Sequence, residues 1–138
     1  MSYSLAVVNG DLQQQGSSLS IVYGINKLTQ DITLWLMEQY GIDRFHPNMG
    51  SVLQQFIGGM VDGSTQAEVQ GEVLRVLQNY QAVQYRGLRQ NPQVYSLSEL
   101  LYSIDSVTAA VTYDTVNVSC ALRNAENQPT VVNAAQSV

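Results

Sequence analysis

The spacing of apolar residues changes once along this chain, close to residue 100, and that change limits the folds the chain can adopt. Before it, apolar residues recur every three or four positions, which is the period of an amphipathic α-helix. After it, residues 104–114 and 115–123 are rich in β-branched residues and alternate with period two, as half-buried strands do. Helices followed by strands are typical of an α+β fold with an antiparallel sheet.

Three helices are expected before the change. They cover residues 27–40, 50–60 and 65–90. Gly41 is a stop signal for the first helix, and Asn91-Pro92 ends the last because proline disfavours helical geometry in the residue before it. The apolar faces are Leu28, Ile32, Trp35 and Leu36; Val52, Leu53, Phe56, Ile57 and Met60; and Val69, Val73, Val76, Leu77 and Tyr80. The expected fold is α+β, with about three helices followed by a small antiparallel sheet.

The chain divides into three parts on this pattern. Residues 1–25 form an N-terminal strand or arm, and residues 26–123 form the main domain. Residues 124–138 are expected to hold a turn, a short strand at 130–132 and a tail. At 138 residues the chain is long enough for a single domain with a substantial core.

The strand region carries few charges that would protect an exposed edge. Only Asp105, Asp114 and Arg123 are charged between residues 104 and 123, and no proline occurs from 93 to 128. Soluble monomers usually guard an open strand edge with charge or proline. We therefore take the apolar strand positions as candidate partner-facing residues: Val107, Val111, Val116, Val118, Cys120 and Leu122. Cys120, the one cysteine, is also expected to be a small buried hydrophobe.

Composition leaves two interpretations open. Charged residues make up 12% of the chain, about half the usual ~25%. This deficit fits either a surface covered by partners or a soluble domain that is rich in glutamine. The net charge of −5 and the absence of a Lys or Arg run argue against nucleic-acid binding, and no 18-residue apolar run indicates a membrane span. Three arginines that share one side of the last helix are candidate partner contacts: Arg75, Arg86 and Arg89.

The segment between the first two expected helices contains the only histidine. One histidine excludes a zinc cluster that needs several His or Cys ligands. Catalysis by His46, or by Glu68 with Glu72, is less favoured than a structural corner between two helices. The expected hinge consists of Gly41, Asp43, Phe45, His46, Pro47, Asn48 and Gly50. We expect no catalytic, cofactor-binding or metal-binding residues.

The order of these features resembles one known family. Gln30 and Asp31 open an amphipathic helix that stops at Gly41, and Asp43, Pro47 and Gly50 precede the next apolar helix. A third helix ending in LQNY (77–80) and a strand with Val116, Val118 and Leu122 follow. Over about residues 27–123 the chain resembles the sheath-initiator, or baseplate-wedge, family of contractile phage tails, some members of which are labelled lysozyme-like. Many members carry Glu-Pro-Arg after the tyrosine matched here by Tyr80, but this chain reads QAVQYRG (81–87) there.

The resemblance implies a structural protein rather than an enzyme. It implies a place in the virion, at the tail baseplate, for a protein made in the host cytoplasm. Its partners would be baseplate wedge proteins, the tail sheath protein, and the tail tube or hub, with six copies in the assembly and no contact with nucleic acid or membrane. The sheet would template sheath polymerisation by β-strand addition. The alternatives are a small lysozyme-like hydrolase and a generic adaptor outside any tail.

Overall fold

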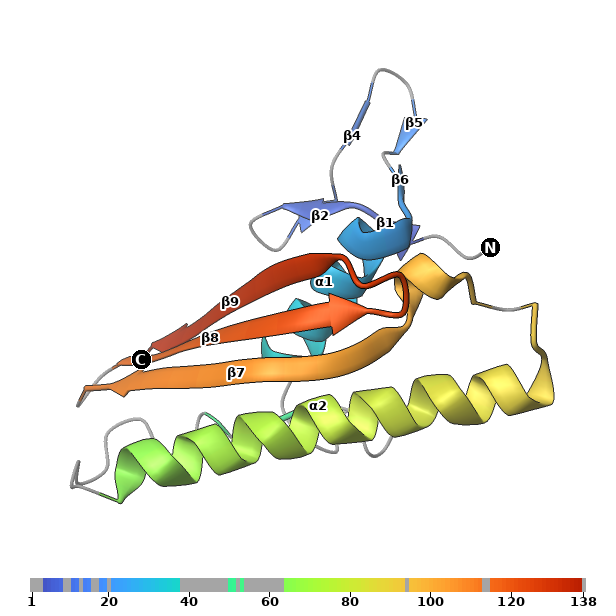
Figure 1. Cartoon of the computed structure of the whole chain (residues 1–138). Coiled ribbons are helices and arrows are strands. Elements are labelled where there is room, and N and C mark those ends of the chain that lie inside the picture. Colours follow the sequence, from blue (N-terminus) through green and yellow to red (C-terminus); the bar gives the residue numbers. More distant parts are fainter. Residues whose placement is uncertain are drawn as a thin grey trace.

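The structure is a computed structural model of the chain. The residues that it describes are 4–8, 11–12, 14–15, 18–19, 21–37, 50–51, 53, 64–93, 95–112 and 115–137. Within them lie two α-helices, α1 (Gly24–Met37) and α2 (Thr65–Gln90), and a 3-10 helix η2 (Leu97–Glu99). A three-stranded antiparallel sheet follows, in the order β7 (Leu101–Val111), β8 (Thr115–Asn124) and β9 (Pro129–Ser137) (Figure 1).

The α+β class predicted from the sequence is correct, but the expectation of three helices is wrong. Two α-helices are found in the described ranges, and the expected start of a helix at residues 50–60 is not helical. Gly50 has φ 103, which no right-handed helix accommodates, and the Ser51 hydroxyl donates to the Leu36 carbonyl at 2.6 Å. Leu53 is in a 3-10 turn, and residues 52 and 54–60 lie outside the described residues.

Helix α2 has the bounds that its apolar spacing predicted. Its buried stripe consists of Val69, Val73, Val76, Leu77 and Tyr80. The helix ends where the Asn91 N–H donates to the Gly87 carbonyl at 2.9 Å, directly before Pro92. Helix α1 begins at Gly24, which has φ 65 and lies three residues before the predicted start. Leu28, Ile32, Trp35 and Leu36 form its buried face, as the sequence predicted.

Strand β9 is longer than the short strand expected at 130–132. It pairs with β8 over its whole length, from Pro129 opposite Arg123 to Ser137 opposite Thr115. Residues 133–137, expected to belong to a tail, are therefore part of the sheet. Val132 and Ala134 are buried while Val131, Asn133 and Ala135 are exposed, so the alternation is present but is carried by small and polar residues. Beyond Val132, the residues Asn133, Ala134 and Ala135 have low strand propensity, which is why the sequence pattern did not reveal the length of the strand.

Both helices cover the same face of the sheet. Helix α2 packs along β7 and α1 packs along β9, as Figure 1 shows. The inward side chains of β8 complete the core between them: Val116, Val118, Cys120 and Leu122, each at most 3% exposed. The opposite face of the sheet carries no helix among the described elements. Neither described helix is long and apolar enough to cross a membrane.

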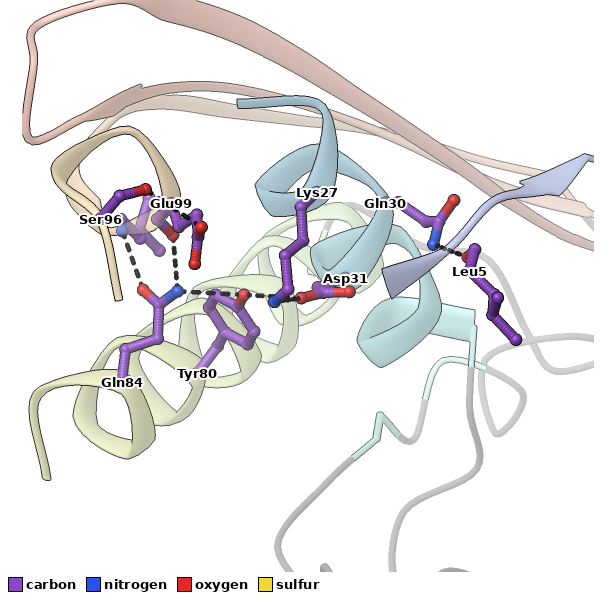
Figure 2. A network of polar contacts seen from close by, with 9 residues as sticks. Leu5, Lys27, Gln30, Asp31, Tyr80, Gln84, Ser96 and Glu99 are labelled. Atoms are coloured by element: carbon purple, nitrogen blue, oxygen red, sulfur yellow. Dashed lines mark hydrogen bonds and ion pairs between the residues drawn. The ribbon is translucent and has the colours of Figure 1, made fainter. Parts of the chain in front are cut away.

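The N-terminal region consists of pairs of two-residue strands. β1 (Ser4–Leu5) pairs with β6 (Ile21–Val22), β2 (Val7–Val8) with β3 (Asp11–Leu12), and β4 (Gln14–Gln15) with β5 (Ser18–Leu19). The Gln30 side-chain amide of α1 donates to the Leu5 carbonyl at 2.8 Å and so ties β1 to the domain (Figure 2).

Candidate assembly surfaces

Most residues of the hinge expected between the first two helices lie outside the part of the chain that the structure describes. Six of its residues lie outside the described ranges: Gly41, Asp43, Phe45, His46, Pro47 and Asn48. Gly50, the last member, has a positive φ, and its carbonyl accepts a 3.4 Å hydrogen bond from the Arg75 guanidinium. The hinge hypothesis therefore stays a prediction for the six, while Gly50 is held against α2.

Most of the candidate partner-facing strand residues are buried, whereas a docking surface requires exposed residues. Val116, Val118, Cys120 and Leu122 face the helices and belong to the core. β8 is also the central strand, so both of its edges are already paired. Burial raises the pKa of the Cys120 thiol to about 11, in keeping with the predicted inert hydrophobe. Val107 and Val111 lie in the edge strand β7 and are half-buried against the core.

The three candidate arginines do not form one group. The Arg75 Nε donates to the Glu72 carboxylate at 2.9 Å, and Arg75 also bonds Gly50, so this side chain serves the fold. Arg86 and Arg89 are exposed on the outer side of α2, beside Tyr85 in a shallow depression. Only these two are available for a partner.

A buried polar network joins the two helices to the start of the sheet (Figure 2). Lys27 pairs with Asp31 at 2.7 Å, and the Tyr80 hydroxyl reaches the same carboxylate at 3.5 Å. The Gln84 amide donates to the Tyr80 hydroxyl at 3.1 Å and to the Glu99 carbonyl at 2.7 Å. Burial, together with the nearby Asp31 carboxylate, raises the pKa of Tyr80 well above its usual value.

This network holds elements together and does not form an open site. Lys27 is 8% exposed and Glu99 is 1% exposed, and the Ser96 hydroxyl donates to the Glu99 carboxylate at 3.0 Å. Buried charges are tolerated when they are paired in this way. The described residues also contain no group of three or more His, Cys, Asp or Glu side chains placed to hold a metal ion.

The face of the sheet opposite the helices carries exposed and half-buried residues. Its rows run across the three strands and consist of small or uncharged residues: Ser106, Ala121 and Val131; Thr108, Ser119 and Asn133; and Ala110, Asn117 and Ala135. A shallow hollow lies over the last two rows. Charge appears only toward one end, where the Arg123 guanidinium bonds Asp105 at 2.8 Å.

The two edges of the sheet have different surroundings. Helix α2 lies along β7, and three of its glutamines bond the β7 backbone. Gln81 donates to the carbonyls of Leu101 and Tyr102, both at 3.0 Å, and Gln70 donates to that of Val107 at 3.4 Å. Gln84 accepts a 2.8 Å hydrogen bond from the Leu101 N–H. Along β9, helix α1 reaches inward side chains instead, with Thr29 bonding Thr130 and Gln136 donating to the Met37 carbonyl.

The architecture is similar to that of a protein of known structure. A protein of Geobacter sulfurreducens, described as a candidate tail lysozyme, superposes on the chain with a TM-score of 0.58. The match covers 82% of this chain and 89% of that chain, at 14% sequence identity. The two proteins share a fold. No protein-family model matches the sequence, and no curated protein sequence matches it either.

The glutamines that bond the β7 backbone were not predicted from the sequence. Gln70, Gln81 and Gln84 are spaced by 11 and 3 residues, which places them on one side of a helix, next to the apolar stripe. That spacing was readable in the sequence. Its role in bonding a strand could not be predicted, because the local pattern does not show which strand the helix lies beside.

Proposed function

We propose that this chain is a non-enzymatic structural subunit of a contractile-tail baseplate, which links wedge proteins to the first ring of sheath subunits. The observation that carries the proposal is the fold shared with the Geobacter sulfurreducens tail protein, over most of both chains. The resemblance of residues 27–123 to the sheath-initiator family, apart from the expected helix at 50–60, supports it from a separate direction.

The surfaces of the domain suit such a linking role. The helices lie on one face of the sheet, the other face carries no described helix, and no described strand pairs with the outer edge of β9. An unpaired strand edge offers a row of backbone donors and acceptors to an extended arm of another chain. On the helical side, exposed Arg86 and Arg89 are the candidates for contacts with wedge proteins. We assign the sheet to the sheath and the outer side of α2 to the wedge.

A hydrolase is the second candidate, because the structural relative is described as a lysozyme. Glycosidases need two carboxyl groups that face a substrate across an open site. In the described domain Asp31 pairs with Lys27, Glu72 with Arg75 and Asp105 with Arg123, an arrangement that favours a structural role. We therefore expect no clearing of a peptidoglycan suspension by the purified chain. Clearing that is lost in His46→Gln would make the hydrolase the better proposal.

Electron microscopy of tails provides the direct test. Tails assembled with a tagged chain should carry the label in a ring at the junction of sheath and baseplate. Deleting the chain should leave tubes on baseplates without polymerised sheath. A label on the tail tip or along the sheath, or normal sheath after deletion, would contradict the proposal.

A further inference from the structure

One stripe of residues runs along the side of α2 that faces away from the sheet (Figure 1). Its members are exposed or half-buried and lie three or four residues apart: Gly71, Leu74, Gln78, Ala82, Tyr85 and Arg89. We call them the outer stripe. Intervals of three and four residues keep a stripe on one side of a helix, as in the seams along which two helices pack. Only Arg89 in the stripe is charged, so α2 has a second face that can receive another helix.

Gly71 occupies a helical position where nothing in the described chain requires a glycine. A Cβ built there meets nothing within 4 Å. Glycine inside a helix is less favourable than alanine, so Gly71 weakens α2 without improving a contact within the described domain. The missing side chain does let a large side chain of a second helix approach the α2 backbone. An interface between helices would therefore explain this glycine.

A shallow hollow on the outer stripe matches the hole into which a side chain of a packing helix fits. Its lining includes Gln78, Gln81, Ala82 and Tyr85, which stand at i, i+3, i+4 and i+7 along α2. Four residues with this spacing surround one inserted side chain in helix pairs. Helical side chains lean toward the N-terminus, so Leu74, which is 39% exposed, does not enter the hollow of its own helix. The hollow is left for a side chain of another molecule.

The charges beside the outer stripe are arranged for pairing with a reversed copy of α2. Among the described residues, three basic side chains pair with a carboxylate, namely those of Lys27, Arg75 and Arg123, whereas Arg86 and Arg89 do not. Exposed Glu68 lies 18 residues before Arg86, which is about five turns, so both stand on the same flank of the stripe. The helix dipole favours an acid first and a base last, but it does not place them on one flank.

Two antiparallel copies of α2 match each other about a twofold axis at Gln78. Residues equally far from Gln78 in the two directions then face each other. Gly71 of one copy faces Tyr85 of the other, and Leu74 faces Ala82, so a large residue meets a small one at each place. Leu74 thereby reaches the hollow of the second copy. On the flank, Glu68 lies within a turn of the second copy's Arg86, and the twofold axis repeats every such contact.

We propose that two copies of this chain pair in solution through the outer stripes of α2, antiparallel, with Leu74 of each copy in the hollow of the other. The interface uses one helix from each copy, so the dimer should be weak and reversible. It covers Arg86 and Arg89, to which wedge contacts were assigned above. A wedge protein would therefore have to displace the second copy. That consequence rests on the proposed function, but the dimer itself does not.

The test is sedimentation equilibrium of the whole chain from micromolar to millimolar concentration, where monomers should give way to dimers. Arg86→Glu sets two like charges together at both ends of the interface and should weaken the dimer about tenfold. Glu68→Arg should do the same. The double variant Glu68→Arg/Arg86→Glu exchanges the two charges and should restore the native dissociation constant. A chain that stays monomeric throughout, or a double variant without rescue, would overturn the proposal.

Two exposed leucines provide a matched pair for the hollow. Leu74→Ala removes the inserted side chain and should also weaken the dimer about tenfold. Leu34→Ala truncates a residue of similar exposure on α1, 37% against 39%, and should dimerise as the native chain does. Circular dichroism checks that both variants fold, which their exposed positions favour. Equal dissociation constants for the two variants would refute the place of Leu74 in the interface.

The outcomes separate this inference from the proposed function. A dimer that Arg86→Glu dissociates, formed by a chain that is absent from tails, would sustain the α2 interface and refute the tail role. A chain that forms the expected ring in tails, yet is monomeric at every concentration, would refute the dimer and leave the tail role standing. A dimer that persists in both Arg86→Glu and Leu74→Ala uses another surface, which would also refute this inference.

Discussion

Tyr80 makes both an aromatic and a polar contact between the two helices. Its ring meets that of Trp35 edge to face, with centroids 5.2 Å apart and planes at 84°, and its hydroxyl lies in the Asp31–Gln84 network. Aromatic pairs of this geometry contribute beyond the area that they bury. The sequence predicted both residues as core. Gln84 lies on the same helix as Tyr80, but Asp31 and Glu99 come from elements distant in sequence, so the pattern could not predict the network.

Replacing Trp35 by alanine should destabilise the domain by about 3–5 kcal/mol, because it removes a side chain that is 8% exposed and leaves a cavity beside Tyr80. The measurement is chemical denaturation followed by circular dichroism. Leu34→Ala, on the exposed side of the same helix at 37% exposure, is the control and should cost far less. Wild-type stability for Trp35→Ala would refute this packing.

The raised pKa of Tyr80 predicts a loss of stability at alkaline pH. An unfolded tyrosine ionises near pH 10, whereas buried Tyr80 keeps its proton at higher pH. Its contribution is therefore fully present below about pH 10 and is lost above it, because the unfolded state then binds fewer protons. Above pH 10 the free energy of unfolding should fall less steeply in Tyr80→Phe than in the native chain. Parallel slopes in urea titrations across this range would contradict the assignment, and Tyr102→Phe, at an exposed tyrosine, is the control.

At the scale of the element, α2 combines two roles along two adjacent stripes. Its apolar stripe was predicted and confirmed, from Val69 to Tyr80. Its glutamine side, Gln70, Gln81 and Gln84, provides the edge of the sheet with side-chain hydrogen bonds. The low charged fraction left open a surface covered by partners or a soluble domain rich in glutamine, and three of the glutamines serve the fold by bonding the edge of the sheet. Covering a strand edge with a helix is a general protection against unwanted pairing.

Two glycines of α2 should respond differently to the same substitution. A Cβ at Gly71 would meet nothing within 4 Å, so Gly71→Ala should stabilise the domain by about 0.5–1 kcal/mol through helix propensity. A Cβ at Gly87 would lie 3.1 Å from the Tyr95 ring, so Gly87→Ala should gain less or lose stability. Thermal melts of the two variants test this, and equal gains would show that the loop after α2 does not press on the helix.

At the scale of the whole molecule, β8 is the strand around which the sheet and the core are built. It pairs on both sides and supplies the middle of the core, so its residues cannot also receive a partner. The hypothesis that Val116, Val118, Cys120 and Leu122 face the sheath is wrong for this reason. A docking role is left to the strands that flank it.

Proline at position 118 should therefore prevent folding rather than block assembly selectively. The Val118 backbone bonds β9 in the ladder, and its side chain is 3% exposed. Circular dichroism should show an unfolded Val118→Pro chain beside a folded Ala135→Pro chain, in which proline stands at an exposed residue of the edge strand β9. A cooperative melt of Val118→Pro close to the native temperature would contradict the central position of β8.

The sequence by itself determined the class, the long helix and the existence of the strands, because each follows from the spacing of apolar residues along one element. It failed where local signals are weak or compete. The expected helix at 50–60 begins instead with a positive φ at Gly50, and β9 extends through Asn133, Ala134 and Ala135, which have low strand propensity.

Only the tertiary structure decided which strand is central, which face the helices cover and which edge stays open. Those properties arise from pairing between segments far apart in the chain. Gln70 and Val107, or Thr29 and Thr130, become neighbours only when α2 lies along β7 and α1 along β9. Periodicity specifies which side of an element is buried. It does not specify which other element covers that side, because that depends on contacts between segments far apart in the sequence. The side-chain hydrogen bonds along the sheet edge form only once those contacts are made.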